Sequence, residues 1–311
     1  MSYSTIADKL RRHEVLILDG GTGTDLQSRG ALMSGDTWCA DANLTHPDIV
    51  RAVHRGYIAA GADIITANTF ATSPIVFSYI GRAADVARID AVAVALARES
   101  AAGTAVCVAG SISTMRPVLP GGDRNNLEFE LREREARALF RTKAETLKSA
   151  GCDLLLMELM RDTDYAVWAS EAALASGLPV WIGISTERGQ DGRLHGWGRA
   201  DCPLEDIART LAALKPAVMM IMHTSPNNTD EALTILRKHW AGPIAVYPEC
   251  GYFKSPDWEF VDVIPPEELL RKSQGWHAQG ASIFGGCCGI GPAHIAALSA
   301  AFGAQIAPRR S

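Results

Sequence analysis

The sequence predicts a single (β/α)8 barrel of the TIM type over residues 1–311. Short apolar runs alternate with amphipathic helical segments along the chain, a pattern typical of parallel strands covered by helices. About eight such strand–helix units can be distinguished, and eight is the number that closes this barrel. A third observation is that each apolar run ends in polar residues, as expected where strand ends line an active site. An open doubly wound sheet, the competing architecture, needs no eighth unit.

The strands and helices follow from the apolar spacing. Strands are expected at 15–18, 63–69, 105–109, 154–158, 180–184, 218–222 and 244–247, with the last one beginning at 282. Helices are expected at 128–149, 163–175, 204–214, 230–239 and 266–278, besides one that starts at 45 and stops at 61 and one that opens at 291–294. Gly61, Gly151 and Gly280 each stand between a helical segment and a strand, where glycine commonly ends a helix.

The predicted strand ends share polar or metal-ligating side chains. They are Asp19, Asn68, Thr69, Ser111, Glu158, Ser185, Thr186, His223, Thr224, Glu249, Cys250, Cys287 and Cys288. In a TIM barrel the carboxyl ends of all strands meet at one face, where active sites are built. The sequence therefore predicts a barrel mouth lined for chemistry.

Cys287 and Cys288 follow a short buried strand that ends in glycines, and a helix opens shortly after them. A helix N-terminus favours thiolate over thiol. Two adjacent thiolates repel each other unless they share a cation, and Zn²⁺ is the expected one. The alternative is that the pair consists of two small buried residues at a tight strand exit.

A glycine-rich turn follows the first strand, from Asp19 through Gly20 and Gly21 to Thr24. Its spacing fits neither a dinucleotide-binding loop nor a phosphate-binding loop that ends in lysine. We expect its backbone N–H groups to face a small anion such as a carboxylate, with Asp19 beside it.

The composition is that of an ordinary globular protein, with 47% hydrophobic and 21% charged residues and a net charge of -5. Charge runs that would indicate nucleic-acid or membrane-surface binding are lacking. Neither a signal peptide nor a membrane-spanning run is recognisable. The seven cysteines are an odd number, which argues against a disulfide framework and favours a reducing cytoplasm.

At these motifs the chain resembles the homocysteine S-methyltransferase family, over nearly its whole length. The similar segments are 19–26, 53–63, 67–70, 109–111 and, most specifically, 285–289 followed by Pro292 and His294. The resemblance implies a TIM barrel in which three cysteines hold zinc. The metal would bind the thiol of homocysteine as a thiolate, which attacks an activated methyl group.

The resemblance also implies a set of substrate contacts. Asp19 and Glu158 would hold the amino group of the amino-acid substrate, and the N–H groups of Gly20 and Gly21 its carboxylate. Asn68 and Thr69, from the second similar unit, are included among the substrate-binding residues. The structural alternatives are that Asp19 caps its turn and that Glu158 pairs with Arg161.

The chain departs from the family at the third zinc ligand. His223 stands at the end of the sixth strand, where the family has cysteine, and Cys250 is gained at the end of the seventh. Three interpretations stay open: His223 completes a Cys₂His site, Cys250 restores three thiolates, or the metal is lost. A Cys₂His site is less negative by one charge, so a bound substrate thiolate would be a weaker nucleophile. A more reactive methyl donor or a different nucleophile is then expected.

The expected partners are a small-molecule thiol or selenol and a small sulfonium donor such as S-methylmethionine, because the chain is close to one bare barrel. A homo-oligomer is compatible with this. Five aromatic residues in predicted loops form either a cage for a cationic donor or ordinary loop packing. They are Trp38, Trp197, Tyr252, Phe253 and Trp258.

Two other functions remain open. A metal-assisted lyase or hydrolase would use the same His223, Cys287 and Cys288 site to activate water, with Glu158 or Glu249 as general base. A non-catalytic zinc- or thiol-binding relative would bind metal without turnover.

Overall fold

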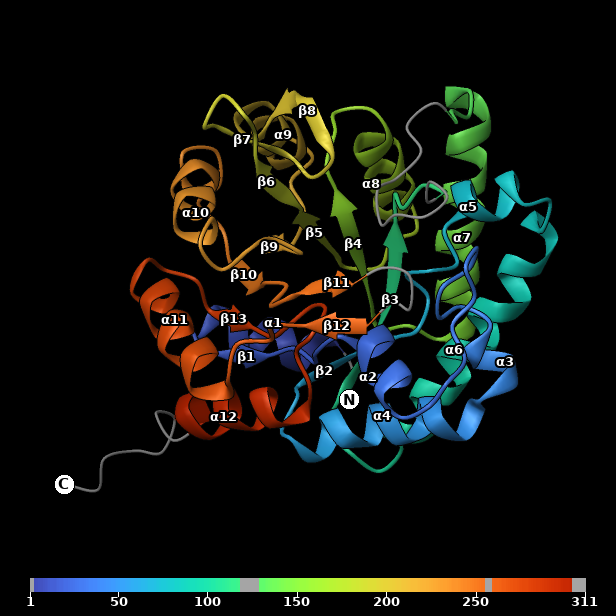
Figure 1. The fold of residues 1–311 in the computed structure, drawn as a ribbon, viewed down its shortest axis with the longest axis horizontal. Helices are drawn as coiled ribbons and strands as arrows, with labels where there is room; N and C mark the ends of the chain where they lie inside the picture. Colours follow the sequence, from blue (N-terminus) through green and yellow to red (C-terminus); the bar gives the residue numbers. More distant parts are fainter. Residues whose placement is uncertain (1–2, 118–128, 255–258, 304–311) are drawn as a thin grey trace.

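The predicted barrel is present in the computed structural model, which describes residues 3–117, 129–254 and 259–303. Eight parallel strands form one sheet in the order β1-β13-β10-β9-β5-β4-β3-β2 (Figure 1). Their bounds are β1 Leu16–Ile17, β2 Ile64–Ala67, β3 Cys107–Ser113, β4 Leu154–Met160, β5 Val180–Ile184, β9 Val218–Met222, β10 Ile244–Tyr247 and β13 Ile283–Phe284. The outermost strands of that order, β1 and β2, also meet through a parallel bridge between Leu18 and Ile64. The bridge closes the sheet into a barrel.

A helix follows each of the eight strands on the outside of the barrel. They are α4 Pro47–Ala59, α6 Val86–Ala101, α7 Glu133–Ala150, α8 Tyr165–Ala175, α9 Leu204–Ala212, α10 Thr229–Arg237, α11 Pro266–Ala278 and α12 Pro292–Gly303. Gly61, Gly151 and Gly280 have φ angles of 95°, 100° and 95°. A residue with a side chain is strained in this conformation, which explains glycine between helix and strand.

The buried apolar side chains form an inner and an outer layer. The outer cluster fills the space between the strands and the helices, and the inner cluster fills the barrel. Helix α1 (Tyr3–Arg11) belongs to the inner layer, because Ile6 is buried there and the Tyr3 hydroxyl accepts a hydrogen bond of 3.0 Å from the Trp181 indole N–H. The amino-terminal helix thus packs against the barrel interior, which the sequence reading did not predict.

Two small antiparallel sheets form where the sequence predicts only loops. One contains β6 Thr186–Arg188, β7 Leu194–Gly196 and β8 Arg199–Pro203, and the other pairs β11 Tyr252–Lys254 with β12 Glu259–Val261. They follow β5 and β10, so both are insertions at the carboxyl ends of barrel strands. Figure 1 shows β11 and β12 in front of the barrel strands.

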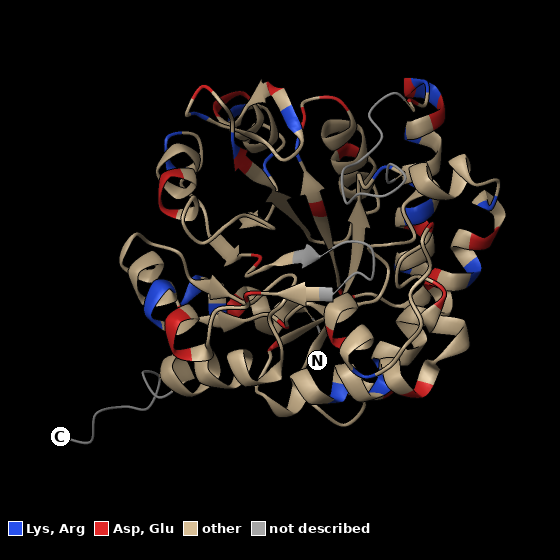
Figure 2. Ribbon diagram, viewed as in Figure 1, with Lys and Arg blue, Asp and Glu red and all other residues tan. Residues whose placement is uncertain are grey.

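The remaining short helices lie in the first two units. They are α2 Thr22–Ser28, α3 Ala42–Thr45, α5 Pro74–Tyr79 and the 3₁₀ turn Ala83–Asp85. Acidic and basic residues are intermixed over the outer helices in the view of Figure 2. Among the described residues, no helix has the length and apolar character needed to cross a membrane.

Candidate active site

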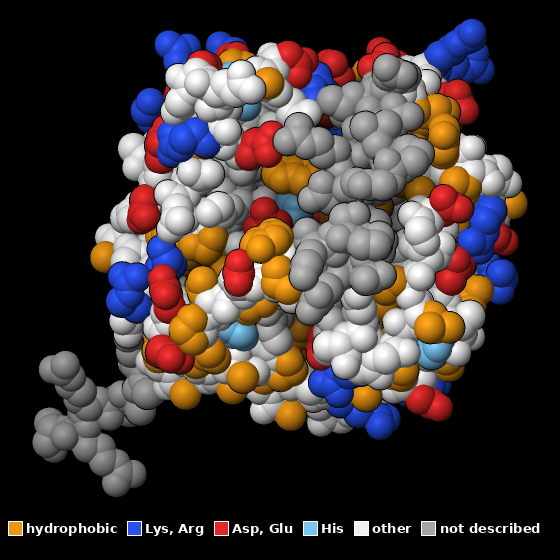
Figure 3. Space-filling view, viewed as in Figure 1, with side chains coloured by type: hydrophobic (Ala, Val, Ile, Leu, Met, Phe, Trp, Pro, Cys, Tyr) orange, Lys and Arg blue, Asp and Glu red, His pale blue; other side chains and the backbone are white. Residues whose placement is uncertain are grey.

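A cavity of about 220 Å³ opens at the carboxyl ends of the barrel strands. In Figure 3 this face is hollowed near its middle, with histidine and acidic atoms at the bottom of the hollow. Residues at or after the carboxyl ends of all eight strands line the cavity; they include Asp19 to Gly23, Asn68, Phe70, Met115, Glu158, Leu159, Trp197, His223, Glu249, Gly251 and Gly286 to Cys288. Seven of the thirteen predicted strand-end residues line this cavity, whereas Thr69, Ser111, Ser185, Thr186, Thr224 and Cys250 do not.

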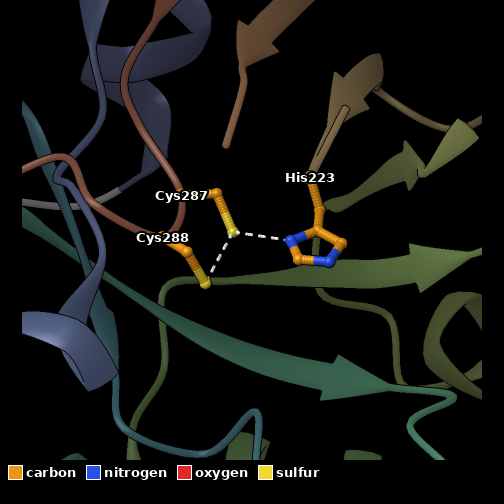
Figure 4. Close-up of side chains that lie close together, drawn as sticks. All are labelled: His223, Cys287 and Cys288. Carbon is orange, nitrogen blue, oxygen red and sulfur yellow. Dashed lines mark hydrogen bonds between the residues drawn. The ribbon is translucent and has the colours of Figure 1, made fainter. Parts of the chain in front are cut away.

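His223, Cys287 and Cys288 form the one group of potential metal ligands found among the described residues. The Cys287 Sγ lies 3.6 Å from His223 Nδ1 and 4.0 Å from Cys288 Sγ, and all three ligand atoms lie within 4.8 Å of one another. Zinc bonds of about 2.3 Å to sulfur and about 2.1 Å to nitrogen place tetrahedral sulfurs about 3.8 Å apart, and sulfur and nitrogen about 3.6 Å apart. The three side chains point toward one another from two strand ends (Figure 4). The donor set fits zinc, and both distances from the Cys287 Sγ are close to the tetrahedral values.

The loop that carries the cysteines is held by close contacts that only glycine permits. A Cβ at Gly286 would lie 2.1 Å from the Ile290 side chain, and Gly289 has a φ of 83° with a Cβ position 2.4 Å from the Cys250 carbonyl oxygen. The Cys287 N–H donates to the Pro248 carbonyl at 2.9 Å. The strand exit therefore aims both thiols into the cavity.

The expectation that this location favours thiolate needs correction. Helix α12 begins at Pro292, with three residues between it and Cys288. The contact with Cys288, then burial, raise the pKa of Cys287 well above its ordinary value, and His223 lowers it by less. The thiol form is thus favoured in the metal-free protein, and a cation is needed for thiolate.

His223 lies directly after β9 in the left-handed backbone region, with a φ of 43°. Its Nδ1 lies 3.1 Å from the Glu249 carboxylate, and its ring meets that of Trp197 edge to face, with centroids 5.1 Å apart. Burial lowers the pKa of the imidazole, but Glu249 and Cys287 raise it by more, to about 9. A backbone strained in this way is typical of functional sites.

Cys250, the alternative third ligand, lies outside the group of metal ligands found among the described residues. Its side chain is 1% exposed and packs in the outer apolar layer. Its N–H donates to the Cys288 carbonyl at 3.0 Å, and burial raises the pKa of its thiol to about 12. The geometry favours His223 over Cys250.

Asp19 and Glu158 are buried carboxylates that face the cavity from β1 and β4. Asp19 accepts hydrogen bonds from the Thr66 N–H at 2.6 Å and hydroxyl at 2.9 Å. Glu158 accepts one from Ser111 and one of 3.1 Å from the Tyr247 hydroxyl. Neither forms an ion pair with a described Lys, Arg or His, so Glu158 does not pair with Arg161.

These carboxylates keep unusual proton affinities because they are buried. Burial, opposed by the hydrogen bonds from Thr66 and assisted by the charge of Glu158, raises the pKa of Asp19 from 3.8 to about 7. Burial also raises the pKa of Glu158, although Ser111 and Tyr247 lower it. A cationic ligand between them would favour the ionised forms of both.

Contrary to the prediction from the sequence, the glycine turn after β1 does not offer both of its backbone N–H groups to a substrate carboxylate. The Gly21 N–H donates to the Ile290 carbonyl at 2.9 Å, so the expectation that it takes a substrate carboxylate is wrong. Gly20 faces the cavity, and a Cβ there would lie 2.2 Å from that same carbonyl oxygen. The glycines are thus required for close packing against the cysteine loop, and a carboxylate contact by Gly20 stays a prediction.

Asn68 and Thr69 behave differently although they are adjacent. Asn68 lines the cavity, but its side chain is engaged with Cys39 and Asn43. Thr69 is fully buried and does not line the cavity, and its hydroxyl bonds the backbone N–H and carbonyl of Ser111, each at 2.9 Å. The expectation that Thr69 binds substrate is corrected: it joins β2 to β3.

Several cavity residues escaped the sequence reading. Tyr247 orients Glu158, and Phe70 and Phe260 line the cavity. Glu249, predicted at a strand end and as a general base, contacts His223. Nothing marked Phe260 in the sequence, because its place depends on the β11–β12 pairing.

The mouth of the eight-stranded barrel thus brings together a Cys₂His group that could hold a metal ion and two buried carboxylates. The family model for homocysteine S-methyltransferase matches residues 16–302. The chain therefore belongs to the homocysteine S-methyltransferase family, and it is a methyltransferase.

Individual relatives agree with this assignment. Homocysteine S-methyltransferase of Escherichia coli (strain K12) is 28% identical over 94% of this chain and 96% of its own length. Betaine–homocysteine S-methyltransferase 1 of Mus musculus is 26% identical over 98% of this chain and 75% of its own. The solved metallated form of the homocysteine methyltransferase MmuM from Escherichia coli has a TM-score of 0.75 at 25% identity, covering 96% of this chain and 99% of that one.

Proposed function

We propose that the protein transfers a methyl group from a small sulfonium donor, of the S-methylmethionine type, to homocysteine or a closely related thiol or selenol, with Zn²⁺ held by His223, Cys287 and Cys288. The observation that carries this proposal is one cavity that contains both the Cys₂His group and the carboxylates Asp19 and Glu158. One cavity that holds both groups can contact the ammonium and the side-chain thiol of the same amino acid.

The two carboxylates would bind the ammonium group of the acceptor. Both face the cavity, both are buried, and neither has a charged partner among the described side chains. An uncompensated buried carboxylate is costly, and a bound ammonium removes that cost. Tyr247 and Ser111 hold Glu158 in place for this contact, and Thr66 holds Asp19.

The Cys₂His group would hold the reacting end of the acceptor. Zinc bound there supplies a thiolate at neutral pH, because coordination deprotonates a thiol and a catalytic site leaves one position open. The acceptor sulfur then forms a bond to the methyl carbon while the carbon–sulfur bond of the donor breaks and its electron pair returns to the donor sulfur. The alignment of these three atoms depends on how the cavity holds both molecules.

Aromatic residues of the cavity would bind the donor. Five of them line the cavity, namely Trp38, Phe70, Trp197, Tyr252 and Phe260, and the Trp38 and Phe70 rings meet edge to face at 6.2 Å. Ring faces attract cations, which suits a sulfonium. Of the residues suggested for this cage, Trp258 and the Phe253 side chain lie outside what the structure describes.

The test uses zinc-loaded protein, homocysteine and S-methylmethionine that carries deuterated methyl groups. Methionine with one labelled methyl on the homocysteine skeleton, measured by mass spectrometry, is expected. Isotopic labelling of the homocysteine carbon chain separates this product from the demethylated donor. Labelled product no faster than without enzyme would reject the sulfonium donor, and product from glycine betaine alone would replace it with a quaternary ammonium donor.

A further inference from the structure

The side chain that contacts His223 most closely from a neighbouring strand is a carboxylate. The strands β9 and β10 pair in parallel with Met222 opposite Tyr247; His223 comes directly after Met222, and Glu249 comes two residues after Tyr247. Glu249 Oε2 lies 3.1 Å from His223 Nδ1, and both residues line the cavity. The edge of the ring that faces Cys287 at 3.6 Å is therefore also the edge beside Glu249.

This geometry excludes a nucleophile–histidine–carboxylate triad. In such a triad one ring nitrogen contacts the nucleophile and the other contacts the carboxylate. Here Cys287 and Glu249 both approach Nδ1 of His223. Glu249 thus lies beside the place where the three ligand atoms converge, and it does not orient the ring from behind.

The total charge of the metal ligands explains why a carboxylate beside His223 matters. Two thiolates and a neutral imidazole leave a bound Zn²⁺ with one negative charge fewer than three thiolates do. A carboxylate beside the imidazole returns one negative charge to the immediate surroundings of the metal. Because the cavity is partly closed from water, a charge at this distance acts strongly on its neighbours.

We propose that Glu249 supplies the surroundings of the metal site with the negative charge that a neutral His223 lacks. The proposal rests on the zinc site of the proposed function. With Glu249 in place, the surroundings of the metal are as negative as those of a three-thiolate site, and a thiolate bound there keeps its nucleophilicity. The weaker nucleophile expected from a Cys₂His site alone is then avoided.

The test is a double-mutant cycle on metal affinity. The full chain is prepared as wild type, Glu249→Gln, His223→Cys and the double variant, and zinc affinity is measured by competition with a chromophoric chelator at fixed pH and salt. Glu249→Gln keeps the size of the side chain and removes its charge. Since groups beside metal ligands change affinity on the order of 10- to 100-fold, we expect such a loss in the His223 background. In the His223→Cys background we expect less than about a threefold change, because the third thiolate already supplies the charge.

The matched control is Glu267→Gln, which removes the same charge from an exposed position on α11. It should leave zinc affinity unchanged, and circular dichroism melting curves show whether each variant is folded. Equal losses in both backgrounds, or no loss in either, would overturn the compensation proposal while leaving zinc binding intact. Folded wild-type protein that binds no zinc would overturn both this proposal and the zinc site itself.

A second measurement reports on the substrate thiol without turnover. In the Co²⁺-substituted protein, the sulfur-to-metal absorbance on adding homocysteine gives the affinity and the pH dependence of thiolate binding. Glu249→Gln should shift the pH midpoint of this absorbance in the wild-type background and leave it in place in the His223→Cys background. The same shift in both backgrounds would contradict compensation, because it would not depend on the identity of the third ligand.

Discussion

The cavity has two sides that differ in how their charged groups are held. On the side of β1 and β4, Asp19 and Glu158 are fixed by neutral hydrogen-bond donors and have no ion-pair partner among the described residues. On the side of β9, β10 and β13, the polar groups contact one another, since Cys287 approaches His223 and His223 pairs with Glu249.

In the proposed function this difference separates recognition from reaction. The buried carboxylates would select a ligand that brings an ammonium group, because a nearby cation favours their ionised forms. The cysteine side would select a metal cation that activates a thiol, because its three ligand atoms lie close together. His223 and Glu249 lie on the proposed reaction side, and Asp19 and Glu158 lie on the proposed recognition side.

Among substitutions on the two sides of the cavity, Glu158→Gln is expected to change kcat/KM for homocysteine most. The substitution keeps the contacts with Ser111 and Tyr247 and removes the charge that faces the acceptor. A lost buried charge contact of about 3 kcal/mol corresponds to a decrease in kcat/KM for homocysteine on the order of 100-fold. Steady-state kinetics with homocysteine and with 4-mercaptobutyrate, which lacks the amino group, measure this. An equal loss with both thiols would show that Glu158 does not recognise the ammonium.

A smaller change in kinetic constants is expected from Trp197→Leu, which tests whether an aromatic residue of the cavity binds the donor and not the acceptor. Trp197 lines the cavity and contacts the His223 ring. Loss of a desolvated cation–π contact raises the KM of a sulfonium donor by roughly tenfold, while the KM of homocysteine stays within about threefold of wild type. Trp197→Phe serves as the control and retains most of the donor affinity. A donor KM unaffected by Trp197→Leu would remove Trp197 from the donor site.

The pH dependence of stability distinguishes Asp19 from an ordinary surface acid. Its pKa lies at about 7 in the folded protein against 3.8 in an exposed carboxyl. Below pH about 4, Asp19 is largely protonated in both the folded and the unfolded protein, so it does not lower the free energy of unfolding. Between pH about 4 and 7 the unfolded chain releases its proton first, and folding loses stability as pH rises.

The variant Asp19→Asn lacks this titration. Denaturant unfolding at pH 4 and pH 8 should show the wild type losing on the order of 2–4 kcal/mol relative to the variant over this range. Bound homocysteine should reduce the difference, because its ammonium favours the ionised carboxylate. A gap between the two proteins that is independent of pH would mean that Asp19 is ionised in the free enzyme.

The smallest effect on activity is expected from Thr69→Val. The hydroxyl of Thr69 joins the backbone of Ser111 outside the cavity. Its loss leaves buried polar groups without a partner, which costs about 1–3 kcal/mol of stability, and kinetic constants should stay within about threefold of wild type. A large increase in the KM of homocysteine at unchanged stability would return Thr69 to the substrate-binding residues.

The sequence predicted the barrel because its strands are continuous apolar runs, and such runs end where polar residues begin. It could not distinguish Asn68 from Thr69, since neighbouring residues at a strand end point in opposite directions and only the register decides which faces the cavity. The strands of β6 to β8 and of β11 and β12 have three to five residues each, too few for a periodic pattern.

In the candidate site, too, the sequence does not show which strand-end residue faces the cavity. Strand-end position places His223, Glu249 and Cys250 at the mouth, and the sequence does not say which of them meets the cysteine pair. The backbone bond from Cys250 to Cys288 directs the Cys250 side chain into the outer core, whereas the left-handed backbone at His223 directs its ring into the cavity. Both outcomes depend on contacts between segments far apart in the chain.

The central claim is that Cys287, Cys288 and His223 hold one zinc ion. Its most direct test is the zinc content of anaerobically purified protein, determined by plasma mass spectrometry for wild type, Cys287→Ser, His223→Ala and Cys250→Ser. We expect about one zinc per chain in the wild type and in Cys250→Ser, and its loss in the other two variants. Zinc retained by His223→Ala and lost by Cys250→Ser, or no zinc in the reconstituted wild type, would contradict the account.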